Sequence, residues 1–371
     1  MLKIIWTEGP EYPMGIQESA CAVLAGKFVS AGGFTRHPKD IIKLHPDAFD
    51  GKPNGFTKLT LVFDPQRPEA GWVRIADIPG PPRQGAAAAV VGDALYAIGG
   101  FNYAEPLTYH STCLLRQERG TWVWTKLECE LPWPVCGASA TVIGTKIYLV
   151  GAADYFKAPG AKNADFHTEC GRGNSPVGRA LLVLDTEDPK AGWRRLADLP
   201  GTPRFDCGCA AAGGNVYVLG GIHAPTSRAG LDAYYNVVDS WVYNPAMDKW
   251  SRVRDMPDGA NRRAVAFGDR YVILLSGYKY RRTWRLDGTQ AEVYTPEEAK
   301  RPWQSFFEKT VLVYDTKTDF LLGTAEPLLD QTSWPGAALH GNTVFCLGGE
   351  GGARLWHPAT FQIGRIEELS P

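Results

Sequence analysis

The segment at residues 345–358, FCLGGEGGARLWHP, ends an apolar run in two glycines and then places a carboxylate where an apolar residue would be expected. Among apolar neighbours the side chain of Glu350 would lose solvation, which raises the pKa of a carboxyl group and suits proton transfer near neutral pH. Arg354 follows four residues later and could hold a ligand's carboxylate through two parallel hydrogen bonds. The pair predicts acid–base chemistry on an anionic ligand; an internal Glu350–Arg354 ion pair is the alternative.

Further polar side chains follow other glycine pairs within a few residues. They are Arg36 and His37, Tyr103 and Glu105, Asp154 and Tyr155, His223 and Arg228, and Lys279 with Arg281 and Arg282. His223 is the best second acid or base, because the unperturbed pKa of histidine lies near neutrality. A structural or solvated loop histidine is the alternative. Arg83, Arg204 and Arg262 recur at the start of inner strands, so we expect them to stabilise the repeat rather than act in catalysis.

These residues lie on a repeat that runs the length of the 371-residue chain. Six segments share a small-residue run, a two-residue turn (GK, GD, GT, GN, GD and GN), an apolar strand, a glycine pair or its remnant, and a second apolar strand, often followed by a tryptophan. Tight-hairpin dipeptides between short runs rich in Val, Ile, Tyr and Phe indicate antiparallel strands. Six units of four antiparallel strands predict an all-β, six-bladed β-propeller.

We expect a single domain over residues 1–371. Its blades are predicted at approximately 17–79, 83–132, 136–200, 204–257, 262–327 and 334–371, with an N-terminal strand at 2–8. The downstream strand of the last unit is predicted in ARLWHP, at residues 353–358. The N-terminal strand and the segment at 361–369 are both candidates for the outermost strand of that blade. Joining the chain ends there would close the ring and remove two open sheet edges.

The units differ in the connection that follows the glycine pair. It is long in the first, third and fifth units, so we expect three loops on one face to wall off the mouth of the axial channel; solvated decoration is the alternative. The residues directly after the glycines or their equivalents are Phe34, Phe101, Ala153, Ile222, Tyr278 and Glu350. Glu350 is the one charged residue of this set, which places the candidate chemistry in the last blade.

Composition excludes some classes of function. Lys plus Arg (39) almost balances Asp plus Glu (40), which removes the attraction that a strongly basic domain has for nucleic acid or anionic membrane. Lys3, Glu8 and two prolines interrupt the N-terminus before an export signal could form, and no segment approaches the ~20 apolar residues of a membrane helix. We therefore expect a soluble, cytoplasmic protein with eight free thiols.

Other chemistries have little support in the sequence. Asp165, His167 and Glu169 alternate and could share one side of an extended metal-binding segment, although a solvated loop is the simpler interpretation. The CGC at residues 207–209 suits neither a CxxC redox motif nor a zinc pair. No P-loop, GxSxG or GxGxxG motif lies between a strand and a helix. We expect no metal and no other cofactor.

The glycine pairs, the VYDP-like strands and the outer tryptophans resemble the kelch repeat over almost the whole chain. A free-standing six-unit propeller of this kind is similar to the sialic-acid mutarotase family, including its circularly permuted members. In that family an acid directly after a glycine pair and an arginine shortly downstream are implicated in the site. Glu350 and Arg354 match this arrangement with a shorter interval than is usual, and the family's typical export signal is missing.

The resemblance implies an isomerase that interconverts the anomers of N-acetylneuraminate or a related carbohydrate by acid–base ring opening, without a cofactor. Glu350 would be the base, Arg354 would neutralise the sugar-acid carboxylate, and His223 or a bound water would return the proton. The residues implied to pack on the apolar face of the sugar ring are Phe34, Phe101, Tyr103 and Tyr278. The residues implied to add further contacts are Arg36, Tyr155, Arg228 and Lys279.

Two other functions are open to a kelch propeller. The first is a non-catalytic module that binds a protein or a glycan. The second is an oxidase of the galactose-oxidase type, which would need copper ligands and flanking domains that the sequence does not show.

Overall fold

The computed structural model describes residues 2–35, 39–50, 55–104, 107–157, 166–170, 176–225, 233–323, 326–351 and 358–368. These ranges consist mostly of strands and the turns that join them. The short helices are α1 (Lys39–Leu44) and 3-10 segments at Pro46–Ala48, Pro68–Ala70, Pro189–Ala191, Glu298–Lys300 and Trp303–Phe306. Among the described residues, no helix has the length and apolar character needed to cross a bilayer.

Six four-stranded sheets in the described ranges repeat one antiparallel order, with the first strand innermost. The first three sheets are β2 (Ala20–Leu24), β3 (Lys27–Thr35), β4 (Gly55–Phe63) and β5 (Trp72–Arg74); β6 (Ala87–Val91), β7 (Ala94–Ile98), β8 (Thr112–Glu118) and β9 (Thr121–Lys126); and β10 (Ser139–Ile143), β11 (Lys146–Val150), β14 (Leu181–Asp185) and β15 (Arg194–Arg195). The other three are β16 (Gly208–Ala212), β17 (Asn215–Leu219), β20 (Ser240–Asn244) and β21 (Lys249–Val253); β22 (Arg263–Phe267), β23 (Tyr271–Leu275), β26 (Val311–Asp315) and β27 (Phe320–Gly323); and β28 (Gly336–His340), β29 (Thr343–Leu347), β30 (Phe361–Glu368) and β1 (Leu2–Glu8).

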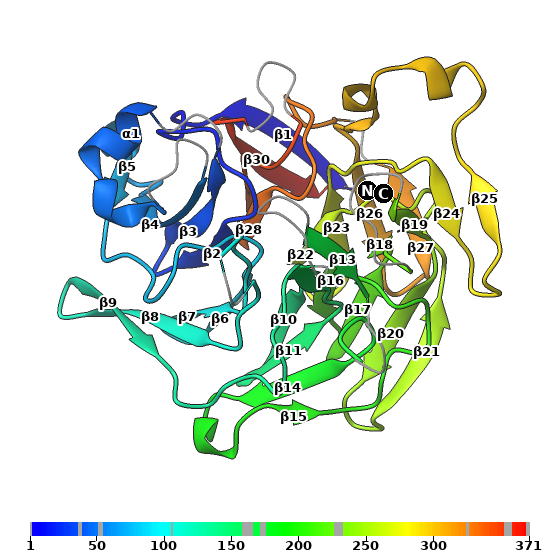
Figure 1. The fold of residues 1–371 in the computed structure, drawn as a ribbon, viewed down its shortest axis with the longest axis horizontal. Coiled ribbons are helices and arrows are strands. Elements are labelled where there is room, and N and C mark those ends of the chain that lie inside the picture. Colours follow the sequence, from blue (N-terminus) through cyan, green and yellow to red (C-terminus); the bar gives the residue numbers. More distant parts are fainter. Residues whose placement is uncertain are drawn as a thin grey trace.

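The first strands of the six sheets surround a common axis. β2 contacts β6, and contacts continue through β10, β16, β22 and β28 back to β2, as Figure 1 shows. Ala20, Ala87 and Gly208 begin three of these strands, because only small side chains leave room where neighbouring sheets converge. The all-β architecture of antiparallel four-stranded sheets agrees with the kelch β-propeller expected from the sequence.

The hairpin turns follow the sequence prediction with two shifts of register. Val91 and Ala94 pair across the predicted GD turn, whose Gly92 has a φ of +58°. In the first unit, however, the turn is Ala25–Gly26, one residue before the predicted GK dipeptide. In the fourth unit it is Gly213–Gly214, one residue before the predicted GN. In both shifted turns a glycine, Gly26 or Gly214, takes the second position and accepts its positive φ. In the fifth unit the turn has three residues, 268–270, rather than the predicted two.

The two chain ends meet in one sheet. β1 runs antiparallel to β30 from the pair Leu2–Glu368 to the pair Glu8–Gln362, and β30 in turn pairs with β29. The N-terminal strand is therefore outermost and β30 is third. The prediction that ARLWHP forms the third strand is wrong, because β30 occupies that place; residues 352–357 themselves lie outside the described residues.

Accessory structure comes from the connections after the glycine pairs. The long connection of the first unit contains α1. That of the third unit contains a hairpin of β12 (Asp154–Lys157) and β13 (Phe166–Glu169). A further sheet, on the right in Figure 1, joins β18 (Ile222–His223), β19 (Tyr235–Val237), β24 (Arg282–Trp284) and β25 (Gln290–Glu292). Its β19–β24 pair is parallel and ties the fourth unit's connection to the fifth's.

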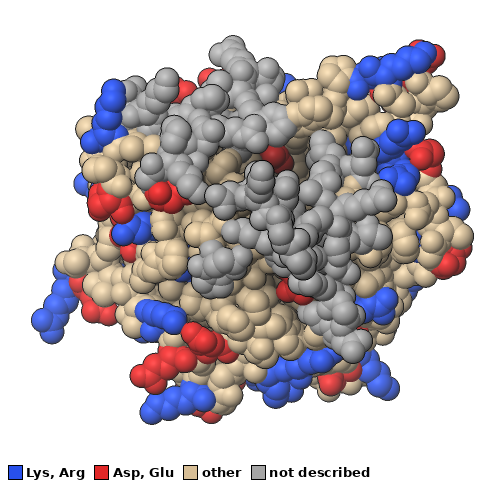
Figure 2. All heavy atoms as spheres, viewed as in Figure 1, with Lys and Arg blue, Asp and Glu red and all other residues tan. Residues whose placement is uncertain are grey.

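Positive and negative side chains are mixed over the described part of the face shown in Figure 2. Figure 2 shows Lys and Arg interspersed with Asp and Glu around the rim, without a large patch of one sign. All eight cysteines are free thiols, as the sequence predicts, and seven of them are buried. The described part of the face in Figure 2 shows no broad patch of positive charge that would attract nucleic acid.

Candidate functional site

The residues that follow the glycine pairs occupy one structural position. Five of them form isolated antiparallel bridges to the residue that precedes the inner strand, and the pairs are Phe34–Gln17, Phe101–Gln84, Ala153–Cys136, Ile222–Phe205 and Glu350–Ser333. In the fifth unit the side-chain Oδ1 of Asn261 takes the place of the backbone oxygen and accepts a hydrogen bond from the amide of Tyr278 at 2.9 Å. Glu350, which is half-buried, thus belongs to the ring that the repeat predicts.

A second ring of residues lies one position further along the chain, and the sequence did not reveal it. Glu18, Gly85, Gly137 and Asp206 all have positive φ, between 47° and 65°. Gly85 donates its amide to the carbonyl of Glu18 (3.0 Å), Gly137 to that of Gly85 (3.1 Å), and Asp206 to that of Gly137 (2.8 Å). Four blades are thereby linked around the axis. A non-glycine residue in this conformation is strained by about 1 kcal/mol or more, so two acids here are a conspicuous departure.

Glycine is required at the other two positions because the acids extend over them. A Cβ built on Gly137 would lie 2.8 Å from Oδ1 of Asp206. One built on Gly85 would lie 2.6 Å from Sγ of Cys136 and 3.1 Å from Oε2 of Glu18, so the acid and the thiol both limit the space there. Gln84 donates from Nε2 to the same Glu18 oxygen at 3.0 Å. Oδ1 of Asp206, in contrast, is buried and has no hydrogen-bond partner among the described residues.

Arg263 brings a positive charge to the same axis. It is the first residue of β22 and pairs with Leu275, whereas the equivalent residues are Ala20, Ala87, Ser139, Gly208 and Gly336. Its Nε donates to the carbonyl of Pro335 at 3.3 Å, and its guanidinium carbon lies 4.3 Å from the ring centre of Trp334. The side chain lines an axial cavity of about 50 Å³ together with Cys21, Ser139, Cys207 and Cys209.

The charges in this cluster act on one another through a poorly solvated region. Burial raises the pKa of Asp206 to about 8, Arg263 opposes the rise and Glu350 adds to it. Burial also raises the pKa of Glu18 well above its ordinary value, reinforced by the charges of Asp206 and Glu350 and opposed by Arg263. Because neighbouring carboxylates resist simultaneous ionisation, the Glu18–Asp206 pair retains a proton near neutral pH.

Aromatic side chains line the surroundings of these acids. Tyr103 lies 6.1 Å from Phe34 and 5.3 Å from Phe101, and the Phe101 ring lies 4.3 Å from Tyr155 (centroid distances). On the other side Tyr278 lies 4.8 Å from Tyr280. The structure therefore brings together the four predicted aromatic residues of the first three blades and places Tyr278 in a separate aromatic cluster.

Two phenols of this lining share the electrostatic environment of the acids. Burial raises the pKa of Tyr155 well above its ordinary value, and the charges of Glu18 and Asp206 contribute to the rise. Burial does the same for Tyr280, with Glu350 as the largest charged contributor. Both phenols consequently stay protonated and can donate hydrogen bonds to a ligand.

His223 lies in a different environment. It is 6% exposed, its Nδ1 is 2.7 Å from the carbonyl oxygen of Pro203, and its ring centre is 4.9 Å from that of Trp284. Burial lowers the pKa of His223 to about 4, and the charges that act on it come from Arg204, Arg179 and Asp239 rather than from the axial acids. Such an imidazole is neutral at pH 7 and holds its Nδ1 proton in a hydrogen bond to the backbone.

Lys279 is also engaged elsewhere. Its ammonium lies 3.1 Å from Glu308 and 3.9 Å from Asp258, and both carboxylates also bind Arg262. Arg83, Arg204 and Arg262 donate from Nη1 to the carbonyls of Gly99, Gly220 and Ser276 at the ends of the second strands. The predicted repeat-stabilising role of these three arginines is confirmed.

Several predicted residues cannot be placed. Arg36, Arg228 and Arg354 lie outside the described residues, as do His37, Glu105 and Asp165. The predicted relationship between Glu350 and Arg354 therefore also lies outside the described residues. Among the residues that the structure describes, no group of three His, Cys, Asp or Glu side chains could hold a metal ion.

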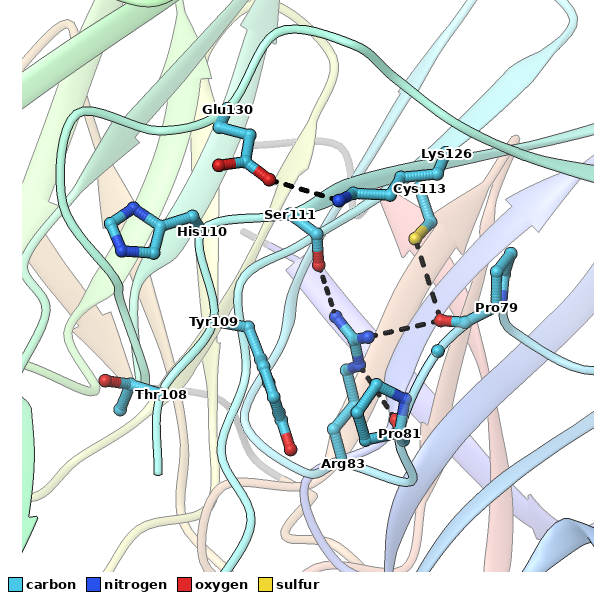
Figure 3. Close-up of a pocket in the computed structure, with 11 residues that line it drawn as sticks. Pro79, Pro81, Arg83, Thr108, Tyr109, His110, Ser111, Cys113, Lys126 and Glu130 are labelled. Carbon is cyan, nitrogen blue, oxygen red and sulfur yellow. Dashed lines mark hydrogen bonds and ion pairs between the residues drawn. The ribbon is translucent and has the colours of Figure 1, made fainter. Parts of the chain in front are cut away.

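A larger cavity, of about 290 Å³, lies away from the axis between the first two blades (Figure 3). Its charged groups are already paired: Arg83 donates to Ser111 Oγ at 2.8 Å and to the carbonyl of Pro79 at 3.1 Å, and Lys126 lies 3.1 Å from Glu130. Burial shifts the pKa values of Arg83, Tyr109 and Cys113 here as well. The axial cluster differs in having a buried carboxylate oxygen without a hydrogen-bond partner among the described residues, so the axis is the better candidate site.

Sequence comparison alone could have found part of the axial cluster. Arg263 stands where the other five units have Ala, Ser or Gly, and Glu18 and Asp206 stand where two units have glycine. The signal is concealed in the fifth unit, because Arg262 directly precedes Arg263 while Arg83 and Arg204 precede Ala87 and Gly208 by four residues. The fifth unit thus lacks three residues at this point, which shifts its sequence relative to the other units.

Comparison with known proteins agrees with this description of the fold. No protein-family model matches the chain. N-acetylneuraminate epimerase of Yersinia enterocolitica is 26% identical over 188 residues, which cover 47% of this chain and 47% of that protein. Kelch-like protein 15 of Danio rerio is 25% identical over 290 residues, which cover 75% of this chain and 41% of that protein. The aligned regions thus span about half or less of these relatives.

A solved structure extends the likeness to nearly the whole chain. The structure of YjhT matches with a TM-score of 0.63 at 13% sequence identity, and the match covers 96% of each chain. At this identity the match shows a shared fold. Together with the kelch-repeat relatives, it confirms the resemblance to kelch proteins and to N-acetylneuraminate epimerases that the repeat predicts.

Proposed function

We propose that the chain is one six-bladed kelch propeller, spanning residues 1–371 and closed by its terminal strands, that accelerates the interconversion of anomers of N-acetylneuraminate or a related sugar acid. The observation that carries the proposal is the position of Glu350. It is the charged member of a ring of otherwise uncharged residues, and its charge acts on Asp206 and Glu18 at the channel axis. Two of the relatives are named N-acetylneuraminate epimerase, which supports the same substrate class.

The chemistry needs only acid–base groups. Glu350 takes the proton of the anomeric hydroxyl, the ring carbon–oxygen bond breaks as the ring oxygen gains a proton, the exposed carbonyl rotates, and the ring closes on its other face. No cofactor takes part in these steps. Positioned acid–base catalysis contributes roughly 10²- to 10⁴-fold, which is sufficient for a reaction that also proceeds unaided.

The sugar lies at the mouth of the channel in this proposal. The described axial cavity of about 50 Å³ has room for water but not for a sugar ring, since one water occupies ~30 Å³ of liquid. The half-buried rings of Tyr103 and Tyr155 contact the sugar, while Phe34, Phe101 and Tyr278 are buried behind them. Arg354 binds the carboxylate, with Arg36 and Arg228 as further cationic contacts.

A second candidate is a non-catalytic propeller that binds a protein or a glycan. The observation in its favour is that Kelch-like protein 15 aligns with 75% of this chain, more than the epimerase does. Axial acids with raised pKa values are not needed for such binding, so catalysis is the stronger proposal.

One NMR experiment separates the two candidates. Freshly dissolved N-acetylneuraminate is followed to anomeric equilibrium in buffer, with the wild-type protein, and with a Glu130→Gln control that removes an exposed carboxylate paired with Lys126 at the rim. The proposal predicts faster equilibration with both proteins. Rates equal to buffer would refute the mutarotase function and leave the binding module as the better account.

A further inference from the structure

We infer that Asp206 is the proton donor to the sugar ring oxygen, acting opposite Glu350. The inference rests on the proposed function and assigns a group that ring opening requires. A base at the anomeric hydroxyl is insufficient by itself, because the departing ring oxygen must gain a proton as its bond to carbon breaks. His223 is a poor source for this proton, since its hydrogen bond to Pro203 and its lowered pKa keep it neutral and engaged.

Geometry selects Asp206 among the acids at the channel axis. Its side chain is only 9% exposed, and its Oδ1 has no hydrogen-bond partner within the described part of the chain. The carboxyl extends over Gly137, its neighbour in the ring of backbone hydrogen bonds around the axis. An unpartnered buried carboxyl oxygen is costly unless it is protonated or binds a ligand, and both conditions suit a proton donor.

The neighbouring charges keep this proton available. The charge of Asp206 raises the pKa of Glu18 in this desolvated region, and the charge of Glu350 raises the pKa values of both, so the two acids together hold a proton that either carboxylate alone in water would release. Arg263 limits the effect, since its charge favours the ionised forms of both acids. The groups that face Asp206 from the surrounding elements are Glu18, Glu350, Arg263, Cys136, Tyr155, Cys170, Cys207 and Tyr280.

The step balances within the protein and the sugar. The O–H bond of Asp206 breaks as its proton passes to the ring oxygen, which keeps the electron pair of the broken carbon–oxygen bond. The anomeric O–H proton passes to Glu350 as the carbonyl forms. On closure the ring hydroxyl attacks the other face of the carbonyl, returns its proton to Asp206, and Glu350 reprotonates the new anomeric oxygen. Both carboxyls end in their starting states.

The test compares Asp206→Asn with wild type and with Asp198→Asn, which removes an exposed carboxylate paired with Arg195. Anomeric exchange of N-acetylneuraminate is measured by NMR between pH 6 and 9.5, and binding by isothermal titration. We expect Asp206→Asn to lower the catalysed rate about 10²-fold with binding within about threefold of wild type. The wild-type rate should fall as pH rises through the pKa of Asp206, near 8, and Asp198→Asn should match wild type.

Failure of the inference is distinct from failure of the proposed function. A wild-type protein that accelerates exchange, beside an Asp206→Asn variant of equal rate and equal pH profile, overturns the inference and leaves the function standing. No acceleration by wild type overturns both. If Asp206→Asn does not fold, Arg263→Gln decides: removing the charge that lowers the pKa of Asp206 should move the alkaline fall in rate to higher pH, and an unmoved or absent fall contradicts the assignment.

Discussion

Arg263 rests with its guanidinium carbon 4.3 Å from the ring centre of Trp334, and its Nε donates to the carbonyl of the next residue, Pro335. This relationship fixes a cation of the fifth blade against the sixth, beside the axial acids. Trp334 has a φ of +46°, so backbone strain is accepted at the position that receives the cation. The charge of Arg263, its stacking on Trp334 and the strained backbone of Trp334 therefore occur together at the contact between the fifth and sixth blades.

Removing the charge of Arg263 should alter the acids in a defined direction. Arg263 lowers the pKa values of Glu18 and Asp206, so Arg263→Gln should raise both, and the alkaline fall in the rate of anomeric exchange should move to higher pH. The pH–rate profile by NMR measures this shift. Arg263→Lys, which keeps the charge and loses the planar stacking, is the matched control and should shift the profile less. A shift to lower pH in Arg263→Gln would contradict the electrostatic account.

The glycine at position 137 should be needed for space as well as for conformation. Gly137→Ala and Gly144→Ala both place alanine at a φ near +60°, which costs each about 1–2 kcal/mol. A Cβ at 137 also meets Asp206 Oδ1 at 2.8 Å, whereas nothing lies within 4 Å of one at 144. We expect Gly137→Ala to lower the free energy of unfolding by ~1–3 kcal/mol more than Gly144→Ala does, as measured by urea denaturation. Equal losses would show that the contact with Asp206 yields without cost.

The free energy of unfolding should depend on pH in opposite ways through two groups. The folded-state pKa of Asp206, near 8, lies above its unfolded value of ~3.9, so the native state binds more protons between these pH values and loses stability as pH rises. His223 has a folded-state pKa of about 4, below its unfolded value of ~6.5, so its contribution is lost as pH falls through that window. Above pH 6.5 the effect of the axial acids remains, and Glu18, whose pKa is also raised, acts in the same direction as Asp206.

Urea denaturation from pH 6.5 to 8 isolates that effect. Wild type should lose stability with rising pH, by up to ~1.4 kcal/mol per pH unit for one proton. Asp206→Asn should reduce this dependence, with Glu18 accounting for what remains, and Asp198→Asn should keep it. A wild-type stability that rises with pH in this range would show that the axial carboxyls are ionised in the native state.

His223 should prove to be a structural residue. Its buried ring is hydrogen-bonded to Pro203 and packed against Trp284 in the accessory sheet. We expect His223→Ala to lower the free energy of unfolding by about 2–4 kcal/mol, and His223→Asn, which keeps a donor, to lose less. Anomeric exchange at pH 7 should stay within a few-fold of wild type for His223→Asn. A 10²-fold loss of rate with unchanged stability would instead restore the proton-return role implied by the family resemblance.

The sequence pattern was sufficient for the strands and for the ring that contains Glu350, because hairpin glycines, period-two apolar runs and small inner-strand residues each have a local cause. It was insufficient where register depends on non-local pairing. β30 takes the third place in the last sheet although ARLWHP carries the expected strand pattern, and the first hairpin turns at Ala25–Gly26 rather than at the predicted GK.

The axial acids were missed for a related reason. Glu18 lies between Gln17 and Ser19 and has the composition of an exposed link, and only the backbone hydrogen bonds to Gly85 show that it is equivalent to a glycine at the axis. Asp206 follows an aromatic residue and directly precedes the CGC segment, whose two thiols are the more conspicuous local feature. Their raised pKa values arise from burial and from charges on other blades, which no local pattern records.

The most direct test of the central claim is exchange NMR on N-acetylneuraminate at anomeric equilibrium and pH 7, with wild type and with Glu350→Gln at equal concentration. The account predicts cross-peaks between the anomers at short mixing times with wild type, and exchange reduced at least about 10²-fold towards the buffer rate with Glu350→Gln, while both proteins bind the sugar. Equal exchange with the two proteins would contradict the assignment of Glu350 as the base, and exchange at the buffer rate with wild type would contradict the catalytic function itself.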